Sequence, residues 1–222
     1  MHTTMLELEN IQGYLIRGYA HMLYSRFVYM QISDAEAFKK WLSKSWQDMT
    51  SARHIHDKSK ISPTHLNIAF THDGLAKLGL HKENLDAFSR EFRQGMVSPH
   101  RSRLLGDSDE SNPENWNWGA NHNEKIHLCL MVFGNDKSGR DDLEKDKIVC
   151  LDYYRQLESE FKQNGIEPIF YIDGQTQPDN KEHFGFRDGI SQPIIEGSGR
   201  VGDKDDVVKA GEFLFGYKNG FG

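Results

Sequence analysis

Asp188 is the acid whose surroundings most strongly suggest chemistry. It lies between Gly185 and Gly189 in the segment Phe-Gly-Phe-Arg-Asp-Gly-Ile-Ser-Gln-Pro, residues 184–193. Glycine permits positive φ angles and lets the backbone come close to a flat or bulky group. A carboxylate held in such a loop can accept a proton and return it during a reaction. The residues alone also allow a structural turn, in which the carboxylate caps backbone amides.

Other motifs in the chain are weaker. Residues 197–202 have the spacing G-x-G-x-x-G, but the largely acidic residues 203–206 that follow would repel a pyrophosphate. His54 and His56 could share a metal ion, yet no third ligand follows at a suitable spacing. The sequence contains no nucleophile elbow, zinc-protease helix or P-loop, so hydrolase and kinase chemistry lack support.

Composition narrows the class of protein. The chain has 222 residues, of which 37% are hydrophobic, which is enough for a proper core. Its net charge of −6 argues against nucleic acid as a partner. Cys129 and Cys150 are too few for a disulfide framework and are expected to be buried, reduced thiols. No apolar run reaches the ~18 residues of a membrane span, and Glu7 and Glu9 are untypical of a signal peptide, so we expect a cytoplasmic protein.

Two strand-helix-strand patterns are expected to position these residues. Apolar and β-branched runs predict strands, and long helices follow the first and the third of them. Residues 33–36, Ser-Asp-Ala-Glu, are interpreted as a capping box that starts the first long helix with the Ser33 hydroxyl. The order predicts a ferredoxin-like α+β fold (βαββαβ), an antiparallel sheet with both long helices on one face. The predicted strands are 24–32, 65–71, 126–134 and 166–173, and the predicted long helices follow residues 33 and 143.

The predicted sheet divides the chain into two parts. Residues 1–175 form the ferredoxin-like domain, with an insertion at about 86–123 that is rich in turn-forming residues. Residues 176–222 carry the segment around Asp188 and the beginning of a second, incomplete ferredoxin-like domain. Within this part, residues 212–217 are the strand candidate. We expect the unfinished sheet there to leave apolar area uncovered, which favours self-association.

The segment around Asp188 resembles the Gly-x-x-Asp-Gly signature of dye-decolorizing peroxidases, a family of haem enzymes. The resemblance runs from about residue 10 to the end of the chain. Further stretches look like blocks of the same family and occur in the family's order. These are residues 10–19, 66–71, 92–96, 104–107, 113–116 and 211–217. The ferredoxin-like prediction agrees with the fold that this family implies.

The resemblance implies a peroxidase that reduces hydrogen peroxide and oxidises dyes and small phenolic or aromatic reductants. The signature acid of the family lies on the distal side of haem b, where it takes the peroxide proton and returns it to the leaving oxygen. Asp188 matches that acid and is the expected catalytic residue. The cofactor-binding residues implied by the same match are Gly185, Phe186, Arg187, Gly189, Ile190 and Ser191.

The resemblance is incomplete at the proximal side of the haem. Family members continue past the length of this chain, and their axial histidine and distal arginine lie in that later part. No histidine follows His183, which is within the distal signature itself. We therefore expect a truncated distal half that has no proximal ligand of its own and binds haem weakly or improperly. A carboxyl-terminal segment or a homo-oligomer would then have to complete the site.

Two alternatives remain open from the sequence. The chain could be a non-enzymatic ferredoxin-like binding or assembly module derived from such a peroxidase. It could also be another ferredoxin-like haem protein, with iron ligated by His127 or His65.

Overall fold

The computed structural model of the chain describes residues 5–56, 62–136, 142–177, 181–187 and 192–221. Its centre is a four-stranded sheet with the strand order β2-β3-β1-β4, in which all neighbours are antiparallel. This is the ferredoxin-like order, and it confirms the predicted fold class. The sheet and its two long helices are β1 (Tyr24–Ile32), α2 (Ala35–Ser45), β2 (Thr64–Phe70), β3 (Leu128–Gly134), α8 (Leu143–Phe161) and β4 (Ile166–Gln175).

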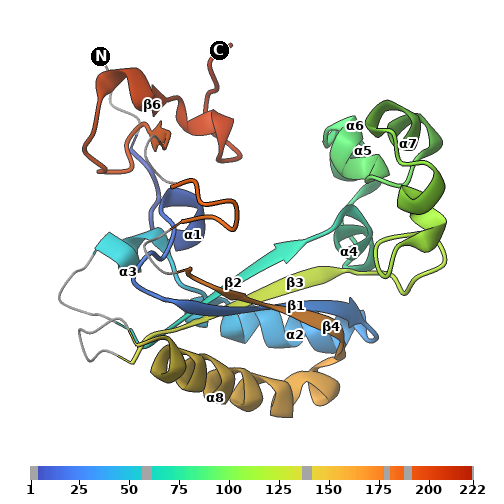
Figure 1. The fold of residues 1–222 in the computed structure, drawn as a ribbon, viewed down its shortest axis with the longest axis horizontal. Coiled ribbons are helices and arrows are strands. Elements are labelled where there is room, and N and C mark those ends of the chain that lie inside the picture. The colour runs from blue at the N-terminus through green and yellow to red at the C-terminus, as the bar shows by residue number, and fades with distance from the viewer. Residues whose placement is uncertain (1–4, 57–61, 137–141, 178–180, 188–191, 222) are drawn as a thin grey trace.

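Helices α2 and α8 cover the same face of the sheet (Figure 1). Along β1, the side chains of Val28, Met30 and Ile32 alternate onto this face and are almost completely buried. Phe38 of α2 and Tyr154 of α8 belong to the same cluster. The period-two pattern of the strands therefore meets the apolar stripe of each helix, which gives the molecule its main core.

Helix α2 begins one residue later than the sequence predicts. The side chain of Asp34, not of Ser33, caps the helix by accepting from the backbone N–H groups of Glu36 and Ala37, both at 3.0 Å. Both residue types are good caps, so the local sequence permits either choice. Ser33 and Asp34 instead donate their backbone N–H groups to the carbonyl of Gly165, which fixes the register of the turn.

Helix α8 approaches the sheet closely at Gly134, the last residue of β3. A Cβ atom on Gly134 would lie 2.4 Å from the backbone nitrogen of Cys150 and 2.6 Å from the carbonyl oxygen of Asp146. Only glycine leaves room for this backbone contact. Asp146 is itself buried, and its carboxylate accepts from the N–H groups of Leu23 and Asp136, at 3.0 and 2.9 Å.

The predicted insertion is an arm that extends from the end of the sheet (Figure 1). It is more helical than its turn-rich sequence suggests. One of its side chains, that of Trp118, packs against Tyr29 of β1 and Phe170 of β4, with ring centroids 5.4 Å apart in both pairs. The helices at the base and in the arm are α4 (His72–Lys77), α5 (Lys82–Ala87), α6 (Arg90–Gln94) and α7 (Pro99–Leu105), followed by the short turns Asp109–Ser111 and Pro113–Asn115.

The amino-terminal and carboxyl-terminal parts of the chain meet in a second lobe, at the opposite end of the sheet from the arm (Figure 1). Ile11 and Ile16 from the amino-terminal part share one apolar cluster with Ile195, Ala210 and Leu214. We call this the terminal lobe. It contains α1 (Gly13–Ile16), α3 (Ala52–His56), β5 (Ile194–Ile195), β6 (Val207–Val208) and the turns Lys204–Asp206 and Ala210–Glu212.

The strand predicted at 212–217 is wrong. The segment continues a short 3₁₀ turn, in which Phe213 and Leu214 donate their N–H groups to the carbonyl of Ala210. Gly211 donates to the carbonyl of Lys218, so the chain closes on itself. The N–H groups of Glu212, Phe213 and Leu214 all bond to carbonyls three or four residues earlier, which is the pattern of a turn and not of a strand pairing. Within the described residues, no helix is long and apolar enough to cross a membrane.

Candidate functional site

The part of the predicted signature segment that the structure describes begins with a tight turn at residues 181–187. The N–H of Glu182 donates to the carbonyl of Phe186 at 2.7 Å, and the N–H of Gly185 donates to the carbonyl of Glu182 at 2.8 Å. Lys181 and Arg187 form an isolated antiparallel bridge at the base of the turn. The turn follows β4, whose end is held by the bond from the N–H of Thr176 to the carbonyl of Leu23. The strand therefore places the turn beside the sheet.

Gly185 shapes this turn. Its φ angle is +83°, a conformation that favours glycine. Among the described residues, a Cβ atom at this position would meet nothing within 4 Å, so the glycine is needed there for its backbone conformation and not for lack of space. On both sides of Gly185 the rings of Phe184 and Phe186 are exposed, by 90% and 76%. Exposed rings at an open turn offer an apolar surface to a bulky partner.

The remaining predicted site residues lie outside the described residues. Asp188, Gly189, Ile190 and Ser191 all fall in this gap, so the position of the expected catalytic carboxylate stays a prediction. Arg187, the last described residue before the gap, has an exposed side chain.

Beyond the gap, the chain enters the core of the terminal lobe. Ile194 and Ile195 of β5 are buried and pair in parallel with Val207 and Val208 of β6. Ile195 contacts the cluster that also contains Ile11 and Leu214. The resembling blocks at 10–19 and 211–217 are thus brought together next to the exit of the signature, although they are far apart in the sequence. The block at 92–96 lies apart from them, in the arm.

The G-x-G-x-x-G spacing has a structural explanation. Gly197 and Gly199 have φ angles of +83° and +73° in the turn after β5, and Ser198 between them is buried. Only the short 3₁₀ turn Lys204–Asp206 follows, so the helix that a phosphate site requires is not formed there.

The histidines considered as iron ligands are held within the fold. His127 accepts the backbone N–H of Ile32 through Nδ1 at 2.9 Å and is 8% exposed. His65 lies 3.3 Å from the hydroxyl of Thr50 and packs against the ring of Tyr19, with centroids 4.4 Å apart. Both imidazoles are thus buried and already in contact with groups of the fold. Among the described residues, no group of three or more His, Cys, Asp or Glu side chains is arranged to hold a metal ion.

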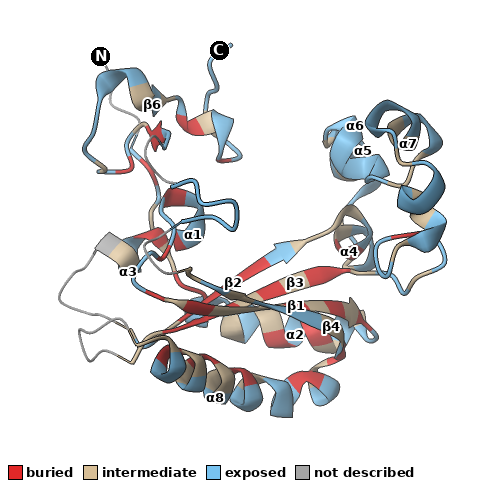
Figure 2. Ribbon diagram, in the orientation of Figure 1, coloured by how far each residue is buried: buried red, intermediate tan, exposed pale blue. Residues whose placement is uncertain are grey.

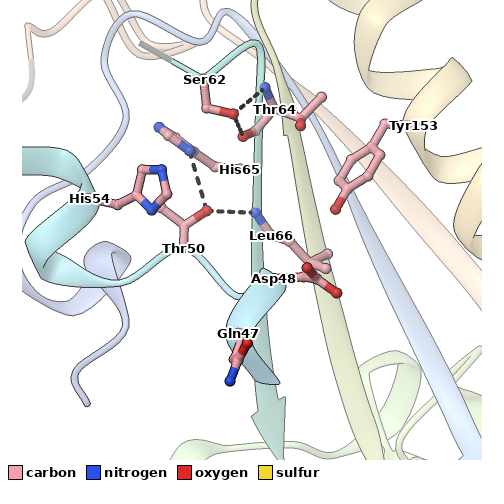
Figure 3. Close-up of a pocket in the computed structure, with 9 residues that line it drawn as sticks. All are labelled: Gln47, Asp48, Thr50, His54, Ser62, Thr64, His65, Leu66 and Tyr153. Carbon is pink, nitrogen blue, oxygen red and sulfur yellow. Dashed lines mark hydrogen bonds between the residues drawn. The ribbon is translucent and has the colours of Figure 1, made fainter. Parts of the chain in front are cut away.

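His65 also lines a polar cavity that sequence reasoning missed (Figure 3). The cavity measures about 230 Å³, and none of the described signature residues lines it. Burial, and then the nearby His21 and His54, lower the pKa of His65 to about 4, so its imidazole is neutral at physiological pH. The residues around the cavity are Gln47, Asp48, Thr50, His54, Ser62, Thr64, His65, Leu66 and Tyr153.

Comparison with known proteins identifies the family. The model of the DyP dimeric alpha+beta barrel domain matches residues 10–178, which include the entire sheet, the arm and α8. The chain belongs to the DyP family. The DyP match ends before the signature segment, but pairwise similarity continues through it.

Full-length relatives show the same relationship. A dye-decolorizing peroxidase of Exidia glandulosa is 30% identical over 219 residues, which cover 96% of this chain and 39% of that protein. An ancestral D-type dye-decolorizing peroxidase superimposes with a TM-score of 0.75 at 27% identity, covering 96% of this chain and 45% of the other. A DyP solved in complex with 2,6-dimethoxyphenol superimposes with a TM-score of 0.74 at 27% identity, covering 98% of this chain and 46% of the other. The chain thus spans about two-fifths of the length of the Exidia relative.

Proposed function

We propose that this chain forms the distal part of a haem peroxidase of the dye-decolorizing type. The observation that carries the proposal is the signature segment in its setting. It begins in a turn whose φ angle at Gly185 favours glycine, no described residue lies within 4 Å of a Cβ atom built there, and the rings of Phe184 and Phe186 at its sides are exposed. Membership of the DyP family supports the same conclusion.

The described residues fit one side of a haem. The open turn can face a flat apolar group without a steric clash, and the ring of Phe186 can pack on it. Haem b, when bound, supplies the iron that takes up peroxide and accepts its oxidising equivalents. Gly185, Phe186 and Arg187 would hold its distal face, together with Gly189, Ile190 and Ser191.

Asp188 is the proposed proton carrier. An unperturbed Asp has a pKa of ~3.9, so the carboxylate is a ready base above moderately acid pH. It would accept a proton from one oxygen of hydrogen peroxide and donate that proton to the leaving oxygen, which departs as water after heterolytic cleavage. The electrons that complete the cycle would come from small aromatic reductants. A relative crystallised with 2,6-dimethoxyphenol supports this class of reductant.

The proximal ligand of the site is not among the residues described. We propose that a complementing carboxyl-terminal segment or a homo-oligomer provides the axial ligand, since His183 lies within the distal signature. The difference in length from the Exidia relative supports this proposal. We also propose a cytoplasmic location and a boundary between the ferredoxin-like domain, 1–175, and the distal part, 176–222.

Reconstitution with hemin tests the proposal. Weak haem binding should give a Soret band and peroxide-dependent dye oxidation. Asp188→Asn should keep the Soret band and lower the oxidation rate by about 100-fold or more, the scale of a lost general acid-base group. Asp152→Asn, which changes an exposed carboxylate of α8, should have no effect. Equal rates in the two variants would remove Asp188 from the mechanism.

A non-enzymatic binding or assembly module is the second candidate function. Among the described residues, the face of the sheet opposite the helices is covered only in part, with Ile172 of β4 still 43% exposed, and this exposure favours a binding role. This function predicts a folded, colourless protein that gives no Soret band with hemin. A haem-dependent dye oxidation that Asp188→Asn abolishes would exclude it.

A further inference from the structure

The polar cavity beside His65 lies at the beginning of β2, which is an edge strand of the sheet (Figure 3). Side chains from four elements meet there. These elements are β2, α3, α8 and the short 3₁₀ turn η1 (Trp46–Asp48). The volume of about 230 Å³ is below the ~300–1,000 Å³ of pockets for drug-sized ligands, so the cavity suits a smaller molecule.

One part of the cavity is a frame of hydrogen bonds within the fold. The hydroxyl oxygen of Thr50 accepts the N–H of Leu66 at 3.0 Å and lies 3.3 Å from Nδ1 of His65. The hydroxyl of Ser62 donates to the carbonyl of Thr64 at 2.7 Å. Because the pKa of His65 is lowered to about 4, this frame carries no positive charge at neutral pH. The frame therefore gives the cavity a fixed, uncharged wall.

Other polar groups that line the cavity are not engaged by the fold. Asp48 of η1, His54 of α3 and Tyr153 of α8 are lining residues, and among the described residues their side chains have no hydrogen bond or ion pair. The hydroxyl of Tyr153 points toward the carboxylate of Asp48 (Figure 3). Burial, and then this carboxylate, raise the pKa of Tyr153. Figure 2 shows that the beginning of β2 is mostly buried, whereas α3 reaches the surface. The unengaged groups are thus open to a molecule that enters from solvent.

The charge of the cavity favours a cation. Asp48 is the one acidic side chain among the described residues that line it, and none of them is a lysine or an arginine. Arg53, next to His54 in the chain, is instead paired with Glu9 at 3.2 Å. A carboxylate beside a cavity that excludes part of the surrounding water attracts a cation more strongly than one on an open surface. An anion would meet this carboxylate without a lysine or arginine to offset it.

We propose that this cavity binds a small organic cation of the primary ammonium or guanidinium class. The N–H groups of the cation would donate to the carboxylate of Asp48, and such charge-assisted hydrogen bonds are stronger than neutral ones. The ring of Tyr153 beside this carboxylate would add a favourable contact with the cation. The proposal goes beyond the peroxidase function and does not depend on it, because none of the described signature residues lines the cavity.

An NMR titration of the purified chain with agmatine measures this binding without haem. Agmatine carries one guanidinium and one primary ammonium group. It is added up to about 20 mM at constant ionic strength, so that its general attraction to a chain of net charge −6 stays equally screened throughout. The backbone amide signals of Asp48, Thr50 and Leu66 should shift in a saturable way, with a Kd of about 1 mM for so small a ligand.

Asp48→Asn is the decisive variant. It keeps the size of the side chain but removes its charge, so the Kd for agmatine should rise by at least about 10-fold. Tyr153→Phe removes only the hydroxyl and should raise the Kd by about 3-fold. Asp152→Asn is the matched control, since Asp152 is an exposed carboxylate of α8 that pairs with Arg155 and does not line the cavity. Its Kd should be unchanged. The spectra of the variants without agmatine check that they are folded.

Three results would overturn the proposal. The first is the absence of saturable shifts up to about 20 mM agmatine. The second is an equal effect of Asp48→Asn and Asp152→Asn, which would reduce the binding to a general attraction between opposite charges. The third is an equally strong, saturable shift of the same signals by acetate or by glycerol, because the cavity would then accept an anion or a neutral molecule as well as a cation.

Discussion

The two faces of the sheet come from the same strands but are covered in different ways. On the helix side, Val28 and Met30 of β1 are completely buried beneath α2 and α8. On the side opposite the helices, which we call the open side, Phe27 and Tyr29 of the same strand are only half-buried, and their cover comes from single side chains of the arm and the terminal lobe. The helix side is a finished core. The open side is a surface with the composition of a core.

This difference separates what stabilises the fold from what is available for association. Burial of apolar area contributes to stability in proportion to the area removed from water. The helix side contributes this free energy within one chain, whereas part of the open side can contribute it only when another surface covers it. Mutations on the two faces should therefore lower the free energy of unfolding by different amounts, and the sizes of the side chains that they remove should not explain the difference.

The largest expected effect is on the helix side. Met30→Ala should lower the free energy of unfolding by about 3 kcal/mol, because it leaves a cavity in a closed core. Phe27→Ala removes a larger side chain but should cost only about 1–2 kcal/mol, since Phe27 is half-exposed and its neighbours can relax. Urea unfolding measures the loss in both variants. Equal losses would mean that the side chains opposite the helices are packed as tightly as those beneath them.

A smaller effect should come from pH at one end of the open side. His65 lies there beside Thr50 and Tyr19, under the amino-terminal segment. Its pKa is lowered to about 4, below the ~6.5 of an unfolded chain, so the unfolded state takes up the proton first. The stabilising contribution is complete above pH 6.5 and is lost as the pH falls towards 4.

Thermal and urea unfolding between pH 7 and pH 5 test this effect. The free energy of unfolding should fall by ~1–2 kcal/mol through His65 over this range. In His65→Gln, that part of the pH dependence should vanish. If the free energy of unfolding of the variant depends on pH as steeply as that of the wild type, groups other than His65 cause the loss of stability.

The smallest expected effect concerns an ion pair at the edge of the helix-covered face of the sheet. Arg26 donates to both carboxylate oxygens of Asp173 at 2.7 Å and lies 3.7 Å from the ring centroid of Tyr171. Arg26→Lys keeps the charge but loses the two-pronged geometry and the ring contact, so we expect a loss of about 1 kcal/mol in urea unfolding. Arg155→Lys, in an exposed pair with Asp152, is the control and should change little. Equal small losses in the two variants would show that the Arg26 ion pair stabilises the fold no more than an exposed surface pair does.

Local periodicity was sufficient to predict the central fold. The predicted strand at 24–32 has the observed bounds, and the second long helix begins at the predicted place, Leu143. These elements were predictable because each has an apolar pattern that is readable within its own residues. The segment 212–217 has a similar apolar content but no partner strand, so its backbone bonds are local and the prediction failed.

The candidate site, too, was predictable only in part from the sequence. The sequence by itself identified Asp188 and its neighbours through a family resemblance, and it supplied the glycine that the turn at 185 requires. It could not show that the exit of this turn packs with both ends of the chain, or that one face of the sheet is left without a layer. Those features depend on contacts between residues far apart in the sequence, and only the folded chain brings such residues together.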